Sequence, residues 1–380
     1  MPERADLFVV AGEPSGDRLG AALIADLRAR RNLDIMGVGG DGMIGQGLDT
    51  LFPLAELSVM GVSDVVLRLP NLLRRLGQLA RLIRRIRPRV VVLIDNKLFS
   101  TLLAKRLRKA GYRGAILLYV APTVWARKPE RAAQIRPLFD EVLAILPFEP
   151  EVMVRLGGPP THYVGHPALA RAASELDLET ARYVALLPGS RAGELKRHLP
   201  LFAELAGRLA QRPERLLFYI PTLPHLAPNL GAAVSSWPVP VAIVTDPEER
   251  RRLESETRVA IACAGTATLE LALAGVPMVI TYVMDGIQSR HFERLGRPWV
   301  GLPNIVLESD VTPECVLAQA DVGPVLAAAQ DLLDRPSSAH AQQAAFRRLR
   351  QMMEEGRPGT PRESAADRVL MHLKDADSLS

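Results

Sequence analysis

The sequence predicts an α/β protein made of two doubly wound parallel sheets, each covered by helices. Short apolar runs such as 7–11 and 90–94 alternate with longer segments, such as 18–30, in which apolar residues recur at helical spacing. Because strands buried on both faces are apolar throughout, these runs indicate parallel strands between two layers of helices. The length of 380 residues exceeds what one hydrophobic core usually serves, which favours two domains.

The predicted strands form two sets along the chain. The first set comprises 7–11, 35–38, 90–94, 115–120, 142–146 and 162–164. The second set comprises 183–187, 216–220, 241–244, 259–263 and 278–282. A loop-like stretch begins at Gly165 between the two sets. We therefore expect domains over 1–165 and 166–345, followed by a helical tail over 346–380.

Composition narrows the class of protein. Hydrophobic residues make up 48% of the chain and charged residues 23%, as in an ordinary globular protein. The two cysteines, Cys263 and Cys315, provide neither a disulfide framework nor a zinc-ligand spacing, and we expect no metal and no cofactor. Without a signal peptide or an apolar run of roughly 18–20 residues, a cytoplasmic protein is expected. The net charge of +5 permits an anionic partner.

The first candidate motif is Gly-Glu-Pro-Ser-Gly-Asp at 12–17, between a predicted strand and a predicted helix. Its small residues allow a tight turn and let a ligand approach the helix N-terminus. The spacing is not the dinucleotide fingerprint. An ordinary turn, with Ser15 or Asp17 as the N-cap of the helix, explains the motif equally well.

Two more strand-to-helix turns suit a nucleotide. The turn after 183–187 presents Gly189, Ser190 and Arg191, whose backbone N–H groups and guanidinium group suit a diphosphate. The turn after 259–263 presents Gly265 and Thr266. Glu270 follows these two residues by about one helical turn, where its carboxylate can accept hydrogen bonds from ribose hydroxyls. An ordinary capped helix remains the alternative for each turn.

The stretch 68–89 contains eight arginines and no acidic residue, with leucine and isoleucine near helical spacing. A basic amphipathic helix of this kind suits an anionic membrane surface. A helix that buries its apolar face in the protein is the alternative. Trp125 suits stacking on a sugar or an acyl chain, and equally suits core packing.

Taken together, the motifs resemble the bacterial lipid-A-disaccharide synthases over nearly the whole chain. The matching stretches are AGEPSGD at 11–17, GVGGDGM at 37–43, GLDTLFPLAELSVMG at 47–61, YVAPTVWA at 119–126, LPFEP at 146–150, YVGHP at 163–167, LLPGSR at 186–191, ACAGTATLELALAGVPMV at 262–279 and LPNI at 302–305. The specificity of the resemblance lies in their joint order and spacing.

The resemblance implies a GT-B fold and a metal-independent, inverting glycosyl transfer in Gram-negative lipid A biosynthesis. The implied substrates are UDP-2,3-diacylglucosamine and 2,3-diacylglucosamine 1-phosphate. The implied products are a β-1,6-linked lipid A disaccharide 1-phosphate and UDP. A peripheral position on the anionic inner-membrane surface is also implied, and the oligomeric state stays open, with a homodimer among the options.

The resemblance also assigns roles to individual residues. It implies UDP contacts at Arg191, Thr266 and Glu270, and a further site role for Asn304. On the acceptor side it implies a lining of Ser15, Gly16 and Asp17, with Trp125 as a further cleft residue.

The sequence departs from the family where a catalytic acid is usual. An Asp-Ala-Pro-Asp-Phe-type segment reads here Asp-Asn-Lys-Leu-Phe, so Leu98 stands at the second Asp and Asp95 at the first. Arg89 replaces another acid, and the other departures are Arg127, Val283 and Leu317. An inverting attack needs a base near the acceptor hydroxyl. Of the remaining acids Asp17, Asp64 and Asp95, we expect Asp95 to act as the base, with Asp17 as the second catalytic candidate.

Three other functions stay open at this point. A divergent relative that binds UDP-sugar or lipid without the standard reaction would explain Leu98 and Arg89. A sugar-nucleotide epimerase of similar fold is the second. A nucleic-acid binder is disfavoured, because the arginine-rich stretch lacks interleaved aromatic residues.

Overall fold

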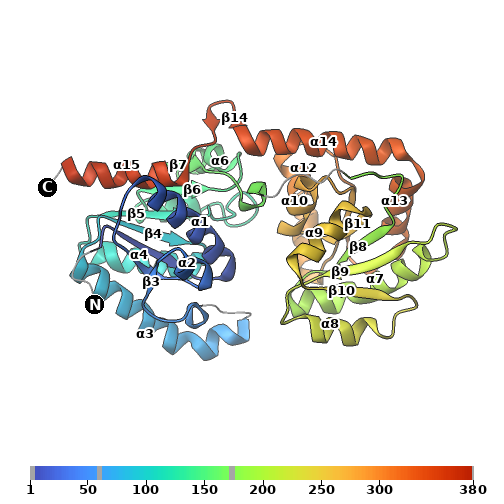
Figure 1. Cartoon of the computed structure of the whole chain (residues 1–380), viewed down its shortest axis with the longest axis horizontal. Coiled ribbons are helices and arrows are strands. Elements are labelled where there is room, and N and C mark those ends of the chain that lie inside the picture. Colours follow the sequence, from blue (N-terminus) through green and yellow to red (C-terminus); the bar gives the residue numbers. More distant parts are fainter. Residues whose placement is uncertain (1–4, 58–61, 171–175, 379–380) are drawn as a thin grey trace. The chain divides into compact units, whose positions relative to one another are not determined.

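The computed structural model describes residues 5–57, 62–170 and 176–378, with side chains except those of 62–69 and 375–378. The chain folds into two α/β units (Figure 1). Unit 1 comprises Met1–Pro167 together with Met353–Ser380, and unit 2 comprises Ala168–Met352. The segment predicted as a separate tail over 346–380 thus falls largely within unit 1.

Unit 1 is built on a parallel sheet with the strand order β3-β2-β1-β4-β5-β6-β7. Chain order reverses between β1 and β4, which pair in register with Leu7 beside Val90. This pair is the topological switch point, where ligands of doubly wound sheets bind. The strands are β1 (Leu7–Ala11), β2 (Ile35–Val38), β3 (Asp49–Thr50), β4 (Val90–Ile94), β5 (Ala115–Tyr119), β6 (Glu141–Ala144) and β7 (Thr161–Tyr163).

The helices of unit 1 include long ones that cover the sheet and short ones in the loops. They are α1 (Pro14–Arg30), α2 (Asp41–Gly45), η1 (Leu54–Glu56), α3 (Val62–Ile86), α4 (Lys97–Lys109), α5 (Arg131–Ile135), α6 (Glu149–Arg155) and α15 (Ala365–Ser378). A short 3₁₀ helix, η2 (Pro167–Ala170), begins with the last residue of the first segment of unit 1 and continues into unit 2. One core cluster joins Leu23 and Leu27 of α1, Val92 of β4, and Val369 and Leu373 of α15. The last helix of the chain therefore completes the core of the first unit.

Unit 2 is built on a second parallel sheet, with the order β10-β9-β8-β11-β12-β13 and a switch point between β8 and β11. The strands are β8 (Tyr183–Leu187), β9 (Leu217–Pro221), β10 (Val241–Val244), β11 (Thr257–Cys263), β12 (Met278–Val283) and β13 (Glu314–Leu317). The helices are α7 (Ala192–Leu209), α8 (Ala227–Val234), α9 (Pro247–Ser255), α10 (Thr266–Leu273), α11 (Gly286–Arg294), α12 (Leu302–Leu307), α13 (Val322–Asp334) and α14 (Pro336–Glu355). Phe202 and Leu205 of α7 pack with Ile261 of β11 and Leu332 of α13 in its core.

A small hairpin carries the chain from α14 back to α15. It is formed by β14 (Gly356–Arg357) and β15 (Thr360–Pro361), which pair antiparallel. Figure 1 shows α15 beside α1, in agreement with the contacts between these helices.

The long basic segment forms α3, a helix with an apolar and a basic face. Leu76, Leu79 and Ile83 are buried, whereas Arg81 and Arg84 are exposed. Arg75 instead pairs with Glu56 at 2.6 Å and stacks over Phe52. Along the described part of the chain, every helix is too short or too polar to span a bilayer.

Candidate functional site

The turns after β1 and β4 meet at the switch point of unit 1. The hydroxyl of Ser15, in the first turn of α1, donates a hydrogen bond to Oδ2 of Asp95 at 3.2 Å. The two turns are tightly packed, because a Cβ atom on Gly12 would lie 2.4 Å from Cβ of Asn96. Gly16 is buried against Ile94, the last residue of β4. The structure thus brings Ser15, Gly16 and Asp95 together at one edge.

The backbone after β4 and β5 is strained. Asp95 and Asn96 have φ angles of +54° and +39°, and Val120 has a φ of +79°. Positive φ is unfavourable for a β-branched residue, and such outliers cluster at functional sites. Asn96 stabilises its own turn, because its side chain accepts from the N–H of Phe99, while Ser100 donates to the carbonyl of Asp95.

Asp17 lies in the same turn but its carboxylate is already engaged. Oδ1 accepts from the N–H groups of Gly40 and Met43, at 2.7 and 3.1 Å, and Oδ2 accepts from Gly42 at 2.9 Å. Asp17 is buried and holds the glycine-rich start of α2. Neither Ser15 nor Asp17 is the N-cap of α1, because this helix starts at Pro14 and Glu13 precedes it.

Two further side-chain pairs continue along this edge of unit 1. Lys97, at the start of α4, donates to the hydroxyl of Thr123 at 3.2 Å. The indole N–H of Trp125 donates to Oε1 of Glu149 at 3.3 Å, and its ring meets Phe148 edge to face. Burial raises the pKa of Glu149 to about 7, against the opposing effect of its hydrogen bonds and of Lys97. Burial also lowers the pKa of Lys97.

Sequence reasoning did not select Glu149 or Lys97 as functional residues. Glu149 lies within the LPFEP stretch of the family resemblance, which is the only sequence feature that draws attention to it. Its burial could not be read from the sequence, since a Glu at a helix start is ordinarily a favourable surface residue.

Two of the departures from the family, Leu98 and Arg89, lie at opposite ends of β4. Leu98 is 57% exposed and belongs to the first turn of α4, at the same edge as Asp95. Arg89 precedes β4, whose five residues span about 17 Å. A whole strand therefore separates Arg89 from Asp95.

In unit 2, the turn after β8 is organised around Glu194. Gly189 has a φ of +98°, and the N–H groups of Ser190 and Arg191 donate to Oε2 of Glu194, both at 3.3 Å. The guanidinium group of Arg191 binds Oε1 at 2.7 Å while its side chain remains 82% exposed. Burial works to raise the pKa of Glu194, but the hydrogen bonds from Arg191 hold it below its usual value. The turn thus presents two N–H groups and an arginine to one carboxylate.

The turn after β11 is its neighbour, because β8 and β11 pair side by side with Leu187 opposite Ala262. Gly265 and Thr266 are exposed at the start of α10. Glu270 is partly exposed, and its Oε2 accepts from Nη2 of Arg250 at 2.9 Å. The structure therefore places both predicted nucleotide turns at one switch point.

Asn304 is buried, unlike the exposed residues of those two turns. It is 1% exposed, and its amide nitrogen donates to the carbonyl of Thr312 and to Glu314. Its oxygen accepts from the N–H groups of Val311 and Thr312. The amide thus joins α12 to the loop before β13.

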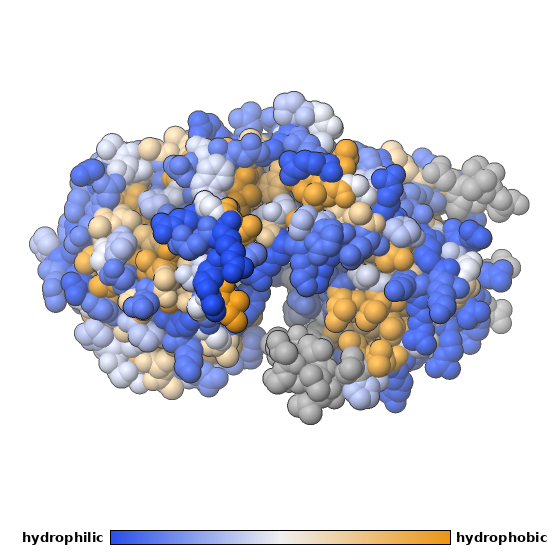
Figure 2. Space-filling view, turned by 180° about the vertical axis from the view of Figure 1, so that it is seen from behind, coloured by the Kyte–Doolittle hydropathy of each residue, from blue (hydrophilic) through white to orange (hydrophobic). Residues whose placement is uncertain are grey.

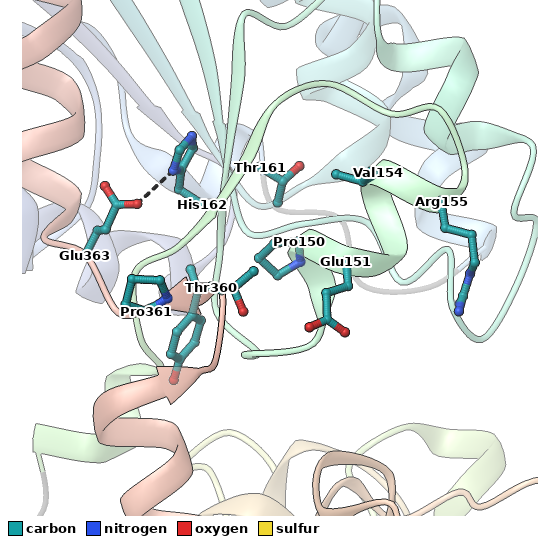
Figure 3. A pocket seen from close by; sticks show the side chains of 11 residues that line it. Pro150, Glu151, Val154, Arg155, Thr161, His162, Thr360, Pro361 and Glu363 are labelled. Atoms are coloured by element: carbon teal, nitrogen blue, oxygen red, sulfur yellow. Dashed lines mark hydrogen bonds and ion pairs between the residues drawn. The ribbon is translucent and has the colours of Figure 1, made fainter.

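A cavity of about 530 Å³ lies elsewhere in unit 1, among α6, β7 and the β14–β15 hairpin. Figure 3 shows Pro150 and Val154 on one side and Pro361 on the other, with His162 joined to Glu363 at 2.8 Å. None of the predicted site residues lines this cavity.

The chain is similar to known proteins along nearly its whole length. A family model described as lipid-A-disaccharide synthetase matches residues 7–368. The lipid-A-disaccharide synthase of Nitrobacter winogradskyi is 39% identical, with 99% of both chains covered. The chain belongs to the lipid-A-disaccharide synthase family. The enzyme of that name from Rhodopseudomonas palustris strain HaA2 is 41% identical, over 97% of this chain and 96% of that one.

Solved structures place the fold. The Staphylococcus aureus MnaA–UDP structure aligns with a TM-score of 0.66 at 11% identity, covering 98% of this chain and 97% of that one. The calicheamicin glycosyltransferase CalG4 aligns with a TM-score of 0.57 at 16% identity, covering 98% and 99%. The GT-B fold predicted for a lipid-A-disaccharide synthase is confirmed. Family membership also confirms the prediction of a hexosyltransferase of lipid A biosynthesis, and it does not favour the epimerase or binding-module alternatives.

Proposed function

We propose that this chain transfers the diacylglucosamine unit of UDP-2,3-diacylglucosamine to the 6-hydroxyl of 2,3-diacylglucosamine 1-phosphate. The product is a β-1,6-linked disaccharide 1-phosphate, and UDP leaves. The observation that carries this proposal is the gathering of family motifs, in each unit, at the two strands that flank its switch point.

The donor contacts belong to the turns after β8 and β11. The guanidinium group of Arg191 and the N–H groups of Gly189, Gly265 and Thr266 suit the oxygens of a diphosphate at two neighbouring helix starts. Positive groups in these positions stabilise the charge that develops on the departing diphosphate. Glu194 binds the guanidinium group of Arg191 and holds it in place, so this group needs little reorganisation when the diphosphate binds.

Ribose binding completes the donor site. Glu270 accepts hydrogen bonds from ribose hydroxyls while Arg250 holds its carboxylate in place. Asn304 contributes indirectly, because its amide is committed to the loop before β13.

Asp95 removes the proton of the acceptor hydroxyl. Its carboxyl is held by Ser15, and one oxygen remains outside that hydrogen bond. As the proton passes to Asp95, the acceptor oxygen attacks C1 of the donor sugar and the bond from C1 to the diphosphate oxygen breaks. Asp17 supports this step by fixing the turn that carries Ser15, since its own oxygens accept from three backbone N–H groups.

Attachment to the anionic inner-membrane surface follows from the acyl chains of both substrates and from α3. Arg74, Arg81 and Arg84 are exposed along this helix, beside exposed Leu73, and Figure 2 shows hydrophobic patches on a largely hydrophilic surface. Co-sedimentation with vesicles of phosphatidylglycerol, weakening with salt, is expected. Equal binding to neutral vesicles would contradict an electrostatic contribution.

A two-substrate transfer assay tests the function, with UDP binding measured separately by calorimetry. We expect disaccharide formation, saturable UDP binding, and a faster reaction for Leu98→Asp, which supplies the carboxylate usual in the family. UDP binding without turnover in the natural chain, restored by Leu98→Asp, would instead favour a binding-only relative. Absence of both binding and turnover would overturn the proposal.

A further inference from the structure

Glu149 is a buried carboxyl group that the proposed transfer step does not use. Its side chain is 2% exposed at the start of α6, directly after β6. Oε2 accepts from the N–H groups of Ile145 and Leu146 at 3.2 and 3.0 Å, and Oε1 accepts from the indole of Trp125 at 3.3 Å. The carboxyl is therefore held by hydrogen bonds on three sides.

Lys97 is a partly buried cation in the first turn of α4. Its ammonium group interacts electrostatically with the carboxyl groups of Glu149 and Asp95 and donates one hydrogen bond, to Thr123. Asp95 precedes Lys97 by two residues, and Ser15 binds Asp95 from the turn after β1. Four consecutive loops of the sheet edge are thus connected by polar side chains.

The backbone fixes the loops that carry these groups. Asp95 and Val120 adopt positive φ angles, which only a well-packed surrounding maintains. Because the loops are fixed, they do not move when the charge of Glu149 changes. The change in charge therefore acts on side chains that stay at a defined distance from Asp95.

We propose that Glu149 is a positioning residue of the acceptor side: its carboxyl holds Trp125 and competes with Asp95 for the ammonium group of Lys97. This inference rests on the proposed function, in which Asp95 is the base. In its ionised form Glu149 adds a negative charge beside Trp125 and Lys97, which its neutral form does not carry.

The other charged groups around this cluster do not reproduce the effect. Glu13 and Arg131 act on Lys97 with opposite signs. Tyr163 of β7 stays protonated, because burial raises its pKa. With Glu149 itself titrating near pH 7, the competition changes within the physiological range.

A fluorescence titration tests the contact without any substrate. Trp237→Phe and Trp299→Phe leave Trp125 as the only tryptophan of the chain. We expect its emission to follow one transition with a midpoint near pH 7. Glu149→Gln abolishes this transition, whereas Glu151→Gln, an exposed carboxylate on the same helix, preserves it. A flat titration of the parent, or an unchanged transition in Glu149→Gln, would overturn the proposal.

A second variant covers the case in which Glu149→Gln does not fold. Lys97→Met retains Glu149 and removes the positive charge beside it, so the transition of Trp125 should move to higher pH. An unmoved midpoint would overturn the competition for Lys97.

The kinetic arm uses kcat/KM for the acceptor as a function of pH. We expect kcat/KM to change as pH passes through the Glu149 transition, with this change lost in Glu149→Gln and moved to higher pH in Lys97→Met. Transfer with the same pH profile in Glu149→Gln would overturn this inference and leave the proposed function intact. Conversely, a chain without transfer activity would refute the proposed function, while the fluorescence titration would still decide the contact.

Discussion

Asp95 has a hydrogen-bonded carboxyl group and a backbone conformation that few residues adopt. Its φ is +54°, and Ser15 binds one oxygen of its carboxyl. Asp95→Asn keeps the size of the side chain and removes the proton acceptor. We expect kcat to fall by about 10²–10⁴, the usual contribution of a general base. Single-turnover measurements of disaccharide formation check this value.

UDP affinity provides the control for this substitution. The proposed diphosphate contacts lie in unit 2, around Arg191, so UDP should bind Asp95→Asn as tightly as the natural chain. Full activity of Asp95→Asn would eliminate it as the base.

By contrast, Asp17→Asn should lower stability by about 1–3 kcal/mol, because its carboxylate accepts from buried backbone N–H groups.

Glu149 makes the stability of unit 1 depend on pH. Burial raises its pKa from 4.5 to about 7, so the folded chain retains a proton that the unfolded chain loses. The stability gained from the neutral form is fully present below the unfolded value and is lost as pH rises through the folded one. The corresponding free energy is about 3 kcal/mol, as an order of magnitude.

Glu149→Gln should remove this dependence, because an amide does not titrate. Melting temperatures of the natural chain and the variant, taken at about pH 5 and about pH 8.5, measure the difference. We expect the variant to gain relative to the natural chain at the higher pH, with Glu151→Gln as the exposed control. Parallel pH curves for the two proteins would contradict a raised pKa.

For single residues, the sequence indicated the residue type and its place in the chain. It did not indicate whether the side chain is buried or hydrogen-bonded. Asp95 and Ser15 were identifiable because they follow strands that a doubly wound fold places side by side. Glu149 was not, since its burial depends on loops that are far apart in the sequence. Asn304 was predicted as a site residue from the family motif alone, and only the structure reveals that its amide is saturated by protein groups.

Among the elements, the turn between β8 and α7 depends on a glycine. Gly189 has a φ of +98°, and an added Cβ would lie 2.7 Å from Oε2 and 2.9 Å from Cβ of Glu194. Gly189→Ala should displace Glu194 and release Ser190 and Arg191 from it. We expect a loss of about 1–2 kcal/mol in stability, and UDP affinity reduced roughly tenfold. Calorimetric titration with UDP and thermal unfolding measure the two effects.

Gly231 supplies the matched control. It lies within α8, and an added Cβ there would meet nothing within 4 Å. Gly231→Ala should leave UDP binding unchanged and raise stability slightly, by about 0.5–1 kcal/mol. Equal effects of the two substitutions on UDP affinity would show that the turn conformation is unimportant.

The apolar runs predicted the buried strands well, while one edge strand of each sheet escaped prediction. β1 and β8, for example, have the predicted bounds, because burial on both faces requires apolar residues throughout. β3 and β13 were not predicted. Asp49–Thr50 is too short and polar to form a pattern, and the residues of β13 are only partly buried at the end of their sheet.

For the whole molecule, the C-terminal segment decides how the chain is divided. The sequence predicted a helical tail over 346–380 but not that its last helix belongs to unit 1. Ala366, Val369 and Leu373 of α15 enter the core built by β1 and β4. A pattern of apolar residues fixes which face of a helix is buried, but not the sheet against which it packs.

A buried ion pair fastens α15 to unit 1. Arg368 binds both oxygens of Glu141 at 2.8 and 2.9 Å, and His372 binds Oε2 at 2.7 Å. The side chain of Glu141 is 2% exposed. Burial works to raise its pKa, but the hydrogen bonds from His372 and Arg368 hold it below its usual value. The folded chain therefore keeps Glu141 ionised, and its contribution to stability is lost only as pH falls through that lowered value.

Arg368→Met should destabilise unit 1 by about 3–5 kcal/mol, because it leaves the Glu141 charge buried with less compensation. Arg335→Met is the matched control: this arginine pairs with Asp331 on the surface at 73% exposure, and its loss should cost at most about 0.5 kcal/mol. Adding Glu141→Gln to Arg368→Met removes the stranded charge and should recover part of the loss. Denaturant unfolding, followed by one probe in unit 1 and another in unit 2, measures all three variants. If Arg368→Met unfolded no more readily than Arg335→Met, the attachment of α15 would rest on its apolar face alone.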